Sequence, residues 1–522
     1  MADRPRFPRS SPSTSKSRRR LALIALTAGL SLAAVADGIG EVRGVTGGVT
    51  VRVPVGIATR IPNNDPPRGI GQIAPRIPGG TMIVPPGIGS RTPVVIDDVD
   101  DTRRRVSKGA ARQTKHTKQT KQVKQIAQRG GFNPPPAGEQ RFVTNDVLLW
   151  MAASVPVVTL DAMARQHRLT RMESQEFALT SRKLFRWRIN DGRPVATVIR
   201  TLMADARVLG AQPNYLYTLQ EDPPAAGKPD QAAYSAQYAL AKLRLPQAHA
   251  ISKGESVVVA MIDTTVDATH PELAGVIAGT YDATGTPEKP QPHGTAMAGA
   301  IAAHGKLMGS APGVKLLSIQ AFGSVKSEGK SDGTSFGILK GLEWAAKQNA
   351  NIVNMSFAGP ADPELQAMLA AARAKGIVLI AAAGNAGPRS RPLYPAADPN
   401  VIAVTATDMD DRLFERANRG AHIAVAAPGV DILVAVPDGG YQTTSGTSVA
   451  AAEVSGIVAL MLARNRKLDP AAVRRLLTST ARDLGPAGPD DQFGAGLTDA
   501  YAALTALDGK PTDVSRASGT AP

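Results

Sequence analysis

The feature that most constrains this chain is a series of short apolar runs that alternate with helix-like segments between residues 255 and 483. A strand that is buried on both faces forms an unbroken apolar run, because neither face meets water. Helical periodicity separates some of these runs, at residues 337–350 and 363–375. The alternation predicts an α/β fold with a mostly parallel sheet covered by helices on both faces. The predicted strands are residues 257–262, 315–322, 351–357, 377–383, 401–405 and 423–427.

Four polar residues stand at predicted strand ends or helix starts. Asp263 directly follows the strand 257–262, and Asn385 follows the strand that ends at residue 383. His293 opens a run of small residues, and Ser448 lies between a Gly-rich turn and a helical segment. Each alone has a structural explanation, as a helix cap, a buried histidine or a turn residue. In an open parallel sheet, however, the functional site lies beyond the carboxyl ends of the strands.

Together the four side chains suit nucleophilic catalysis. A hydroxyl is a weak nucleophile, so it needs a base within hydrogen-bond reach and a carboxylate that holds the base in one tautomer. An amide donor must then stabilise the oxyanion that develops during attack. Ser448, His293 and Asp263 supply the first three groups, and Asn385 supplies the fourth. Their order along the chain, Asp before His before Ser, is that of subtilisin.

Five segments around these residues resemble the signature blocks of the subtilisin-like serine proteases (subtilases, peptidase family S8). They are MIDTTVDATHPEL, HGTAMAGAI, NIVNMSF, AAAGNAGP and TSGTSVAAAEVSG, in the family's order. The resemblance implies that Ser448 attacks the scissile carbonyl while His293 acts as general base and then general acid. It also implies that Asp263 orients His293, and that Asn385 forms the oxyanion hole with the N–H group of Ser448.

The resemblance further implies a cleft for a polypeptide substrate and no required cofactor. The sequence assigns no metal ligand and does not reveal whether calcium has a structural role. We expect a monomer, and no nucleic-acid role for the catalytic domain. The residues that would flank the substrate and its main specificity pocket are Met355, Ser356, Phe357, Ala358, Gly359, Ala383 and Gly384.

The chain departs from the family pattern at a few positions near these blocks. Thr265 and Ala358 each replace a usual glycine. Val449, Ala452 and Glu453 stand where Met, Pro and His are usual. None of these changes removes a catalytic group, so they bear on the shape and efficiency of the cleft. They also leave open an alternative from another functional class. In this alternative the chain has a catalytically impaired subtilase fold that acts as a protein-binding module.

The basic charge of the chain lies in its first 224 residues, which carry 34 basic and 17 acidic side chains. Residues 1–36 are expected to be an export signal, because Lys16 and three arginines precede a 16-residue apolar run at 21–36. An uncleaved membrane anchor at 21–36 is the alternative. The protein is therefore expected to be secreted or periplasmic.

Residues 37–138 are expected to be disordered and of low complexity. Between residues 37 and 96 there are 12 Gly and 9 Pro, a proportion too high for a packed domain. Residues 103–129 carry ten basic side chains and no acidic one. This stretch either binds an anionic partner or is a solvated linker, and the absence of aromatic side chains that could stack on bases favours the linker.

Residues 139–222 resemble, more weakly, the propeptide domain of the subtilases. Their pattern predicts a small α+β unit of order β-α-β-α-β, with one strand at 177–189 and a closing segment at 212–219. The resemblance implies an intramolecular chaperone and inhibitor, and we expect self-cleavage between about Gln220 and Tyr238. The predicted organisation is completed by a linker at 223–234, a peptidase domain at 235–508 and a tail at 509–522.

Overall fold

The structure is a computed structural model that describes residues 131, 133–152, 154–220, 237–327 and 330–509. Several of the predicted segments lie outside the described residues. These are the export signal at 1–36, the low-complexity region as far as residue 130, the linker at 223–234 and the tail from residue 510.

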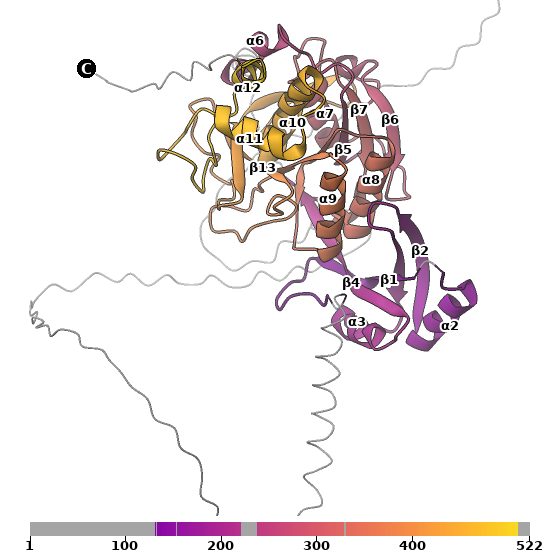
Figure 1. The fold of residues 1–522 in the computed structure, drawn as a ribbon. Coiled ribbons are helices and arrows are strands. Elements are labelled where there is room, and N and C mark those ends of the chain that lie inside the picture. Colours follow the sequence, from indigo (N-terminus) through magenta and orange to yellow (C-terminus); the bar gives the residue numbers. More distant parts are fainter. Residues whose placement is uncertain (1–130, 132, 153, 221–236, 328–329, 510–522) are drawn as a thin grey trace, which may run out of the picture. The chain divides into compact units, whose positions relative to one another are not determined.

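Seven parallel strands form the central sheet of residues 237–509, in the order β14-β13-β12-β10-β5-β7-β6 (Figure 1). This sheet confirms the predicted fold class. Six of these strands were predicted, and the seventh, β6, was not. It is an edge strand whose residues alternate in exposure, so it does not form a continuous apolar run. The strands are β5 (Val258–Asp263), β6 (Ile277–Asp282), β7 (Lys315–Gln320), β10 (Ile352–Met355), β12 (Val378–Ala382), β13 (Ile402–Thr407) and β14 (Ile423–Pro428).

Helices cover both faces of this sheet (Figure 1). Apolar side chains of α7 (Pro292–Ala302) and α10 (Thr447–Arg464) pack with one face, and those of α8 (Ser335–Lys347) and α9 (Pro363–Ala374) pack with the other. Helix α10 is long and apolar enough to cross a membrane, but 89% of it is buried inside the protein. Within the described residues it is therefore a core helix, and its burial fixes the position of its first turn.

The remaining elements of this domain lie around the central sheet. They are α5 (Tyr238–Lys242), α6 (Leu245–His249), η1 (Pro271–Leu273), β8 (Phe322–Ser327), β9 (Lys330–Thr334), β11 (Phe357–Ala358), β15 (Ile432–Val436), β16 (Gly440–Thr444), α11 (Pro470–Thr480) and α12 (Ala500–Leu507).

An antiparallel sheet of order β2-β3-β1-β4 forms the N-terminal domain, with α2 and α3 sharing one core with it. The order of elements is β-α-β-β-α-β. The strand predicted at residues 177–189 corresponds to β3, which begins later, at Arg182, and β2 is an additional strand that was not predicted. Strands β2 and β3 form a hairpin there, and Ser181 in the turn has a φ of 53°. Most residues of β2 are polar, so the strand lacks the apolar alternation by which a sequence reveals a strand. The elements are β1 (Phe142–Met151), α2 (Val157–His167), β2 (Leu169–Phe177), β3 (Arg182–Ile189), α3 (Val195–Met203) and β4 (Val208–Leu219).

Hydrogen bonds join the N-terminal domain to the starts of α8 and α9. The amide of Gln212 donates to Asp362, the N-cap residue of α9, at 2.7 Å. Asn214 accepts the backbone N–H of Phe336 in the first turn of α8, at 3.2 Å. These partners satisfy polar groups at two helix starts, which would otherwise need water. Burial raises the pKa of Asp362, and hydrogen bonds to its carboxylate only partly oppose this.

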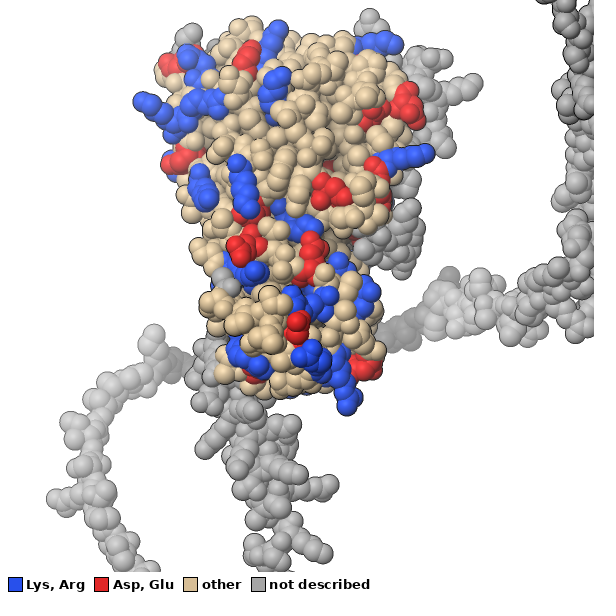
Figure 2. Space-filling view, turned by 90° about the vertical axis from the view of Figure 1, so that its right-hand side faces the viewer, with Lys and Arg blue, Asp and Glu red and all other residues tan. Residues whose placement is uncertain are grey.

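Basic and acidic side chains are interspersed on the face drawn in Figure 2. Among the ion pairs of the described residues, Asp411 pairs with both Lys242 and Arg482, each at 2.8 Å. Residues 103–129, on which an anionic partner would depend, lie outside the described residues. The charged surface of the described residues therefore does not test whether residues 103–129 bind an anionic partner.

Candidate active site

Three side chains that are distant in the sequence meet at the carboxyl end of the central sheet. Asp263 is the last residue of β5, and His293 and Ser448 are each the second residue of a helix, α7 and α10 respectively. His293 Nδ1 lies 2.7 Å from Asp263 Oδ1, and His293 Nε2 lies 3.2 Å from Ser448 Oγ. All three residues are at most 3% exposed. The structure therefore brings together the three residues that the sequence singled out.

The hydrogen-bond partners determine the tautomer of His293. An ionised carboxylate can only accept, so Nδ1 of His293 carries the proton that is shared with Asp263. Nε2 is then unprotonated and faces Ser448 Oγ, as a general base requires. The backbone N–H of Thr264 also donates to Asp263 Oδ1, at 2.7 Å, which helps to hold the carboxylate in place.

The side chain of Asn385 is anchored by its oxygen. Oδ1 of Asn385 accepts the backbone N–H and the hydroxyl of Thr447, at 3.1 and 2.8 Å. The amide nitrogen Nδ2 is buried and has no hydrogen-bond partner among the described residues. Nearby, the backbone N–H of Ser448 donates to the carbonyl of Gln220 at 3.2 Å. Two donors with these positions can stabilise an oxyanion that forms from a carbonyl.

The end of β4 occupies the cleft as an added strand. It pairs antiparallel with β9 on one side and with β11 on the other. Phe357 lies opposite Leu219, Ala358 lies opposite Thr218, and the N–H of Gln220 donates to the carbonyl of Ser356 at 3.2 Å. A chain of extended residues is thus bound by its backbone on both sides, which is how a cleft binds peptides of varied sequence.

Tyr217 anchors this strand. Its ring is fully buried, packs edge-on against Phe357 at 5.8 Å and directs its hydroxyl to the carbonyl of Pro360 at 3.2 Å. A Cβ atom at Gly359 would lie 2.4 Å from the ring, so only glycine leaves room for it. The contact between Tyr217 and Pro360 could not be predicted, since the two residues are 143 positions apart and no local pattern links them.

The other predicted cleft residues are placed differently. Gly384 is held by the hydroxyl of Thr447, which accepts its N–H at 3.1 Å, and has a φ of 113°. Ala383 precedes it and is fully buried. The side chain of Met355 is also fully buried, but it packs in the core beside α8 and α9. The structure therefore does not bring the Met355 side chain into the cleft.

Comparisons with known proteins agree with this geometry. The sequence profile of the subtilase family (Peptidase_S8) matches residues 254–496. Thermitase of Thermoactinomyces vulgaris is 33% identical over 278 residues, which cover 52% of this chain and 96% of thermitase. The chain belongs to the subtilase family. It is a serine-type endopeptidase, and subtilisin E of Bacillus subtilis (strain 168) is 34% identical over 281 residues, covering 52% of this chain and 72% of subtilisin E.

A solved structure supports the same family fold. Fervidolysin from Fervidobacterium pennivorans, described as a keratinolytic enzyme related to subtilisin, matches with a TM-score of 0.61 and 25% sequence identity. The match covers 72% of this chain and 63% of that chain. The α/β fold predicted from the strand pattern, and its subtilisin-like form implied by the resemblance, are thereby confirmed.

The departures from the subtilase pattern leave the three central side chains in contact. The hydroxyl of Thr265 donates to the side-chain oxygen of Gln320 at 2.9 Å, so the replacement of glycine is accommodated by a new hydrogen bond. Ala358 retains the backbone pairing with Thr218. Val449 and Ala452 are buried in the core beside the sheet. None of these four changes removes a hydrogen bond among Asp263, His293 and Ser448.

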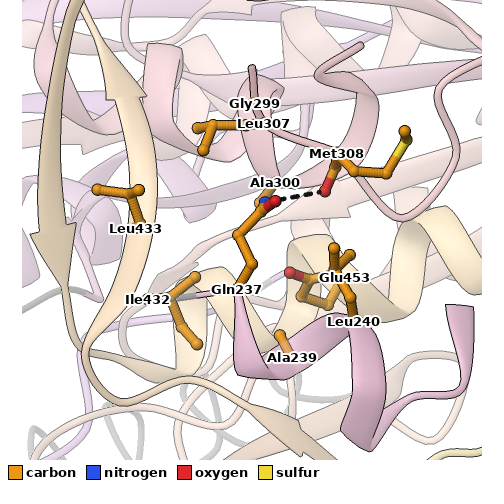
Figure 3. A pocket seen from close by; sticks show the side chains of 10 residues that line it. All are labelled: Gln237, Ala239, Leu240, Gly299, Ala300, Leu307, Met308, Ile432, Leu433 and Glu453. Carbon is orange, nitrogen blue, oxygen red and sulfur yellow. Dashed lines mark hydrogen bonds between the residues drawn. The ribbon is translucent and has the colours of Figure 1, made fainter. Parts of the chain in front are cut away.

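Glu453 is a more consequential departure for this subtilase. Its carboxyl is buried on α10 and is hydrogen-bonded to the hydroxyl of Ser310. Burial raises its pKa to about 8. It lines a small pocket, partly open to solvent, in which Gln237 donates to the carbonyl of Met308 at 3.4 Å (Figure 3). The other lining residues are Ala239, Leu240, Gly299, Ala300, Leu307, Ile432 and Leu433.

No group of three or more His, Asp or Glu side chains that could hold a metal ion occurs among the described residues. The expectation that no cofactor is required stays a prediction. Glu272, the most heavily hydrogen-bonded carboxylate in the neighbourhood of the pocket, accepts three backbone N–H groups and the hydroxyl of Tyr441. Protein donors thus saturate this carboxylate.

Proposed function

We propose that this subtilase hydrolyses peptide bonds through an acyl-enzyme, with Asp263, His293 and Ser448 as its catalytic triad. His293 Nε2 takes the proton of Ser448 as Oγ attacks the scissile carbonyl, and then gives it to the leaving amine. Asp263 keeps the proton on Nδ1 and stabilises the imidazolium that forms. The contacts of 2.7 and 3.2 Å between these side chains support the proposal.

Asn385 and the N–H group of Ser448 form the proposed oxyanion hole. In the ground state the substrate carbonyl receives one hydrogen bond, from Ser448, as the carbonyl of Gln220 does. The amide of Asn385 gains a partner only when the carbonyl oxygen moves as it becomes tetrahedral. A donor that is paired only in the transition state lowers the barrier without tightening substrate binding. The buried Nδ2 of Asn385, which has no hydrogen-bond partner among the described residues, supports this role.

The N-terminal domain, residues 139–222, is proposed to be a propeptide, which makes the chain a zymogen. The observation that carries this proposal is the hydrogen bond between the N–H of Ser448 and the carbonyl of Gln220. It puts that carbonyl where a substrate's scissile carbonyl would bind. We therefore narrow the expected cleavage window of 220–238 to the bond between Gln220 and Glu221. After cleavage the same strand remains as a product-like inhibitor.

The strand also indicates a substrate preference. Counted back from the proposed cleaved bond, Gln220 is the first residue and Tyr217 the fourth. Tyr217 is fully buried and hydrogen-bonded at its hydroxyl, so the fourth position is expected to favour a large aromatic residue, tyrosine in particular. Polypeptides with such a residue are the proposed substrates.

Export is part of the proposal, through a signal at residues 1–36 that lies outside the described residues. An uncleaved anchor at 21–36 remains the alternative, and the monomeric state stays a prediction. Fractionation of a producing cell distinguishes a cleaved export signal from an uncleaved anchor. An anchored protein stays with the membrane fraction, whereas a secreted or periplasmic protein is found in the soluble fraction.

Labelling with a serine-directed fluorophosphonate tests the catalytic proposal. The modified peptide should contain Ser448, and His293→Ala should abolish labelling in a protein that still unfolds cooperatively. Without its base the hydroxyl keeps a high pKa and reacts slowly near neutral pH. A folded wild type, free of the N-terminal domain, that does not label would favour the alternative function, a binding module.

The Ser448→Ala variant tests the zymogen proposal separately. Produced in a protease-deficient host, it should accumulate as a precursor, whereas wild type should yield a product that begins at Glu221. Normal processing of the variant would show that another protease makes the cut. The triad assignment would be unaffected by that result.

A further inference from the structure

A chain of buried side-chain hydrogen bonds runs from the middle of α10 to its first turn. Ser455 Oγ lies 3.0 Å from Asn354 Oδ1, and Asn354 Nδ2 lies 2.9 Å from Ser356 Oγ. Ser356 Oγ in turn lies 3.1 Å from the backbone oxygen of Ser448. All four residues are fully buried. The chain thus ends on the main chain of the proposed nucleophile.

The direction of the chain follows from its last member. The carbonyl oxygen of Ser448 has no hydrogen, so it can only accept, and the hydroxyl of Ser356 must donate to it. That hydroxyl then accepts from Nδ2 of Asn354, which leaves Oδ1 of Asn354 facing Ser455. The hydroxyl of Ser455 also lies 2.9 Å from the carbonyl of Ala451, so Asn354 shares this donor with the helix.

Ser356 connects the nucleophile to the substrate strand. Its backbone carbonyl accepts the N–H of Gln220 at 3.2 Å and lies 3.0 Å from Ser448 Oγ. Its hydroxyl holds the backbone of Ser448 at the same time. The hydrogen bond from the Ser356 hydroxyl to the Ser448 carbonyl, together with the contact between the Ser356 carbonyl and Ser448 Oγ, holds the first turn of α10 relative to the segment that binds the peptide. Any rotation of Ser356 would change the distance between Oγ and the scissile carbonyl.

Asn354 is unusual for its position in the sheet. It lies in β10, a central strand, and its neighbours Ile352, Val353 and Met355 are fully buried apolar residues. An amide buried in such surroundings costs free energy unless each of its groups is paired, and an apolar residue of similar size would avoid the cost. Its hydrogen bonds lead in two steps to the carbonyl of Ser448. Packing of the core therefore does not explain why residue 354 is asparagine, whereas its hydrogen bonds do.

We infer that Asn354 is a positioning residue, which holds Ser448 in attacking geometry through the hydroxyl of Ser356. The inference rests on the proposed role of Ser448 as nucleophile. Displacement of a reacting group by about 1 Å can cost roughly 100-fold in rate, so loss of this chain should lower the rate of the chemical step. Substrate binding by the backbones of β9 and β11 should be little affected.

The test compares processed enzymes that carry Asn354→Leu, Ser356→Ala or both. Each single variant should lower kcat by about 10- to 100-fold with KM within about twofold. The double variant should be no slower than the slower single one, because both act on one hydrogen bond to Ser448. Ser455→Ala should cost about fivefold, the effect of one neutral hydrogen bond shared with the helix.

Thr405→Val provides the matched control. Thr405 is fully buried in β13, and its hydroxyl has no partner among the described residues. The variant removes a buried polar group of a central strand without touching the chain, so its kcat should equal that of wild type. Thermal unfolding of all variants separates stability from rate. If Asn354→Leu does not fold, Ser356→Ala and Ser455→Ala carry the test.

Fluorophosphonate labelling distinguishes failure of this inference from failure of the proposed function. The second-order rate of labelling at Ser448 should fall in parallel with kcat. Wild-type labelling at Ser448 combined with unchanged kcat in the variants would overturn the positioning role. Losses confined to KM, or additive losses in the double variant, would overturn it as well. An unlabelled Ser448 in wild type would instead contradict the proposed function.

Discussion

The buried carboxyl of Glu453 makes the stability of this subtilase depend on pH. Its pKa is raised to about 8 by burial, whereas an unfolded chain ionises near the ordinary value of 4.5. Between these values the native state binds a proton that the unfolded state has lost, so the free energy of unfolding falls as pH rises. Each pKa unit corresponds to about 1.4 kcal/mol, which makes the total loss roughly 5 kcal/mol as an upper bound.

Glu453→Gln removes this titration while conserving shape. The new amide oxygen can still accept from the hydroxyl of Ser310, so the core should remain packed. The variant should therefore become more stable than its parent as pH rises from about 5 to about 8, by up to roughly 5 kcal/mol. Below pH 4.5 both states of the parent are protonated, and the carboxyl adds no pH dependence there.

Urea unfolding at pH 5, 6.5, 8 and 9 measures the effect, in a Ser448→Ala background that prevents self-digestion. The same substitution at Glu272 is the control. Burial opposes ionisation of Glu272, but hydrogen bonds from Tyr441 and from backbone N–H groups outweigh it and lower its pKa. Its carboxyl is ionised in both states above pH 5, so Glu272→Gln should shift stability by a constant amount. A difference between Glu453→Gln and its parent that does not change with pH would refute the reasoning.

Three further predictions concern the cleft. Asn385→Leu should lower kcat by about 10²–10³, a magnitude established for subtilisin itself, with little change in KM, and an unchanged kcat would mean that the oxyanion donor is another group. Isolated residues 141–220 should inhibit the processed enzyme, and inhibition assays that show none would contradict the propeptide assignment. Gly359→Ala should weaken that inhibition about tenfold or more, since its Cβ would collide with the ring of Tyr217, and equal inhibition constants would contradict the anchoring role.

The sequence alone was sufficient to single out the four candidate residues that the structure brings to one site. A continuous apolar run predicts a buried parallel strand, and a carboxylate directly after it must lie at the sheet's carboxyl edge. This reasoning found Asp263, and the same logic found Asn385 after β12. His293 and Ser448 begin helices whose small and apolar residues predict burial. The separations of 2.7 and 3.2 Å could not be predicted, because they depend on how α7 and α10 pack on the sheet.

The N-terminal domain was harder to predict, because its features depend on tertiary contacts. Strand β3 is predicted but β2 is missed, since most residues of β2 are polar and it is held in the sheet by backbone pairing with β3. The closing strand at residues 212–219 is predicted correctly, but its register against β9 and β11 is not predicted. Nothing local to Gln220 indicates that its carbonyl meets the N–H of Ser448, 228 positions further along the chain.

The cleft strand shows why side-chain patterns identify a substrate site incompletely. Residues 355–359 were predicted as a block, yet their contributions differ in kind. Met355 points into the core, because successive side chains of a strand alternate between its two faces. Ser356 acts through its carbonyl, which any residue would carry, and through a hydroxyl that only Ser or Thr would supply. Gly359 has no side chain, and the space this leaves is occupied by the ring of Tyr217. Backbone acceptors and empty space have no signature in composition or periodicity, so only the fold reveals which residues of the block bind the peptide.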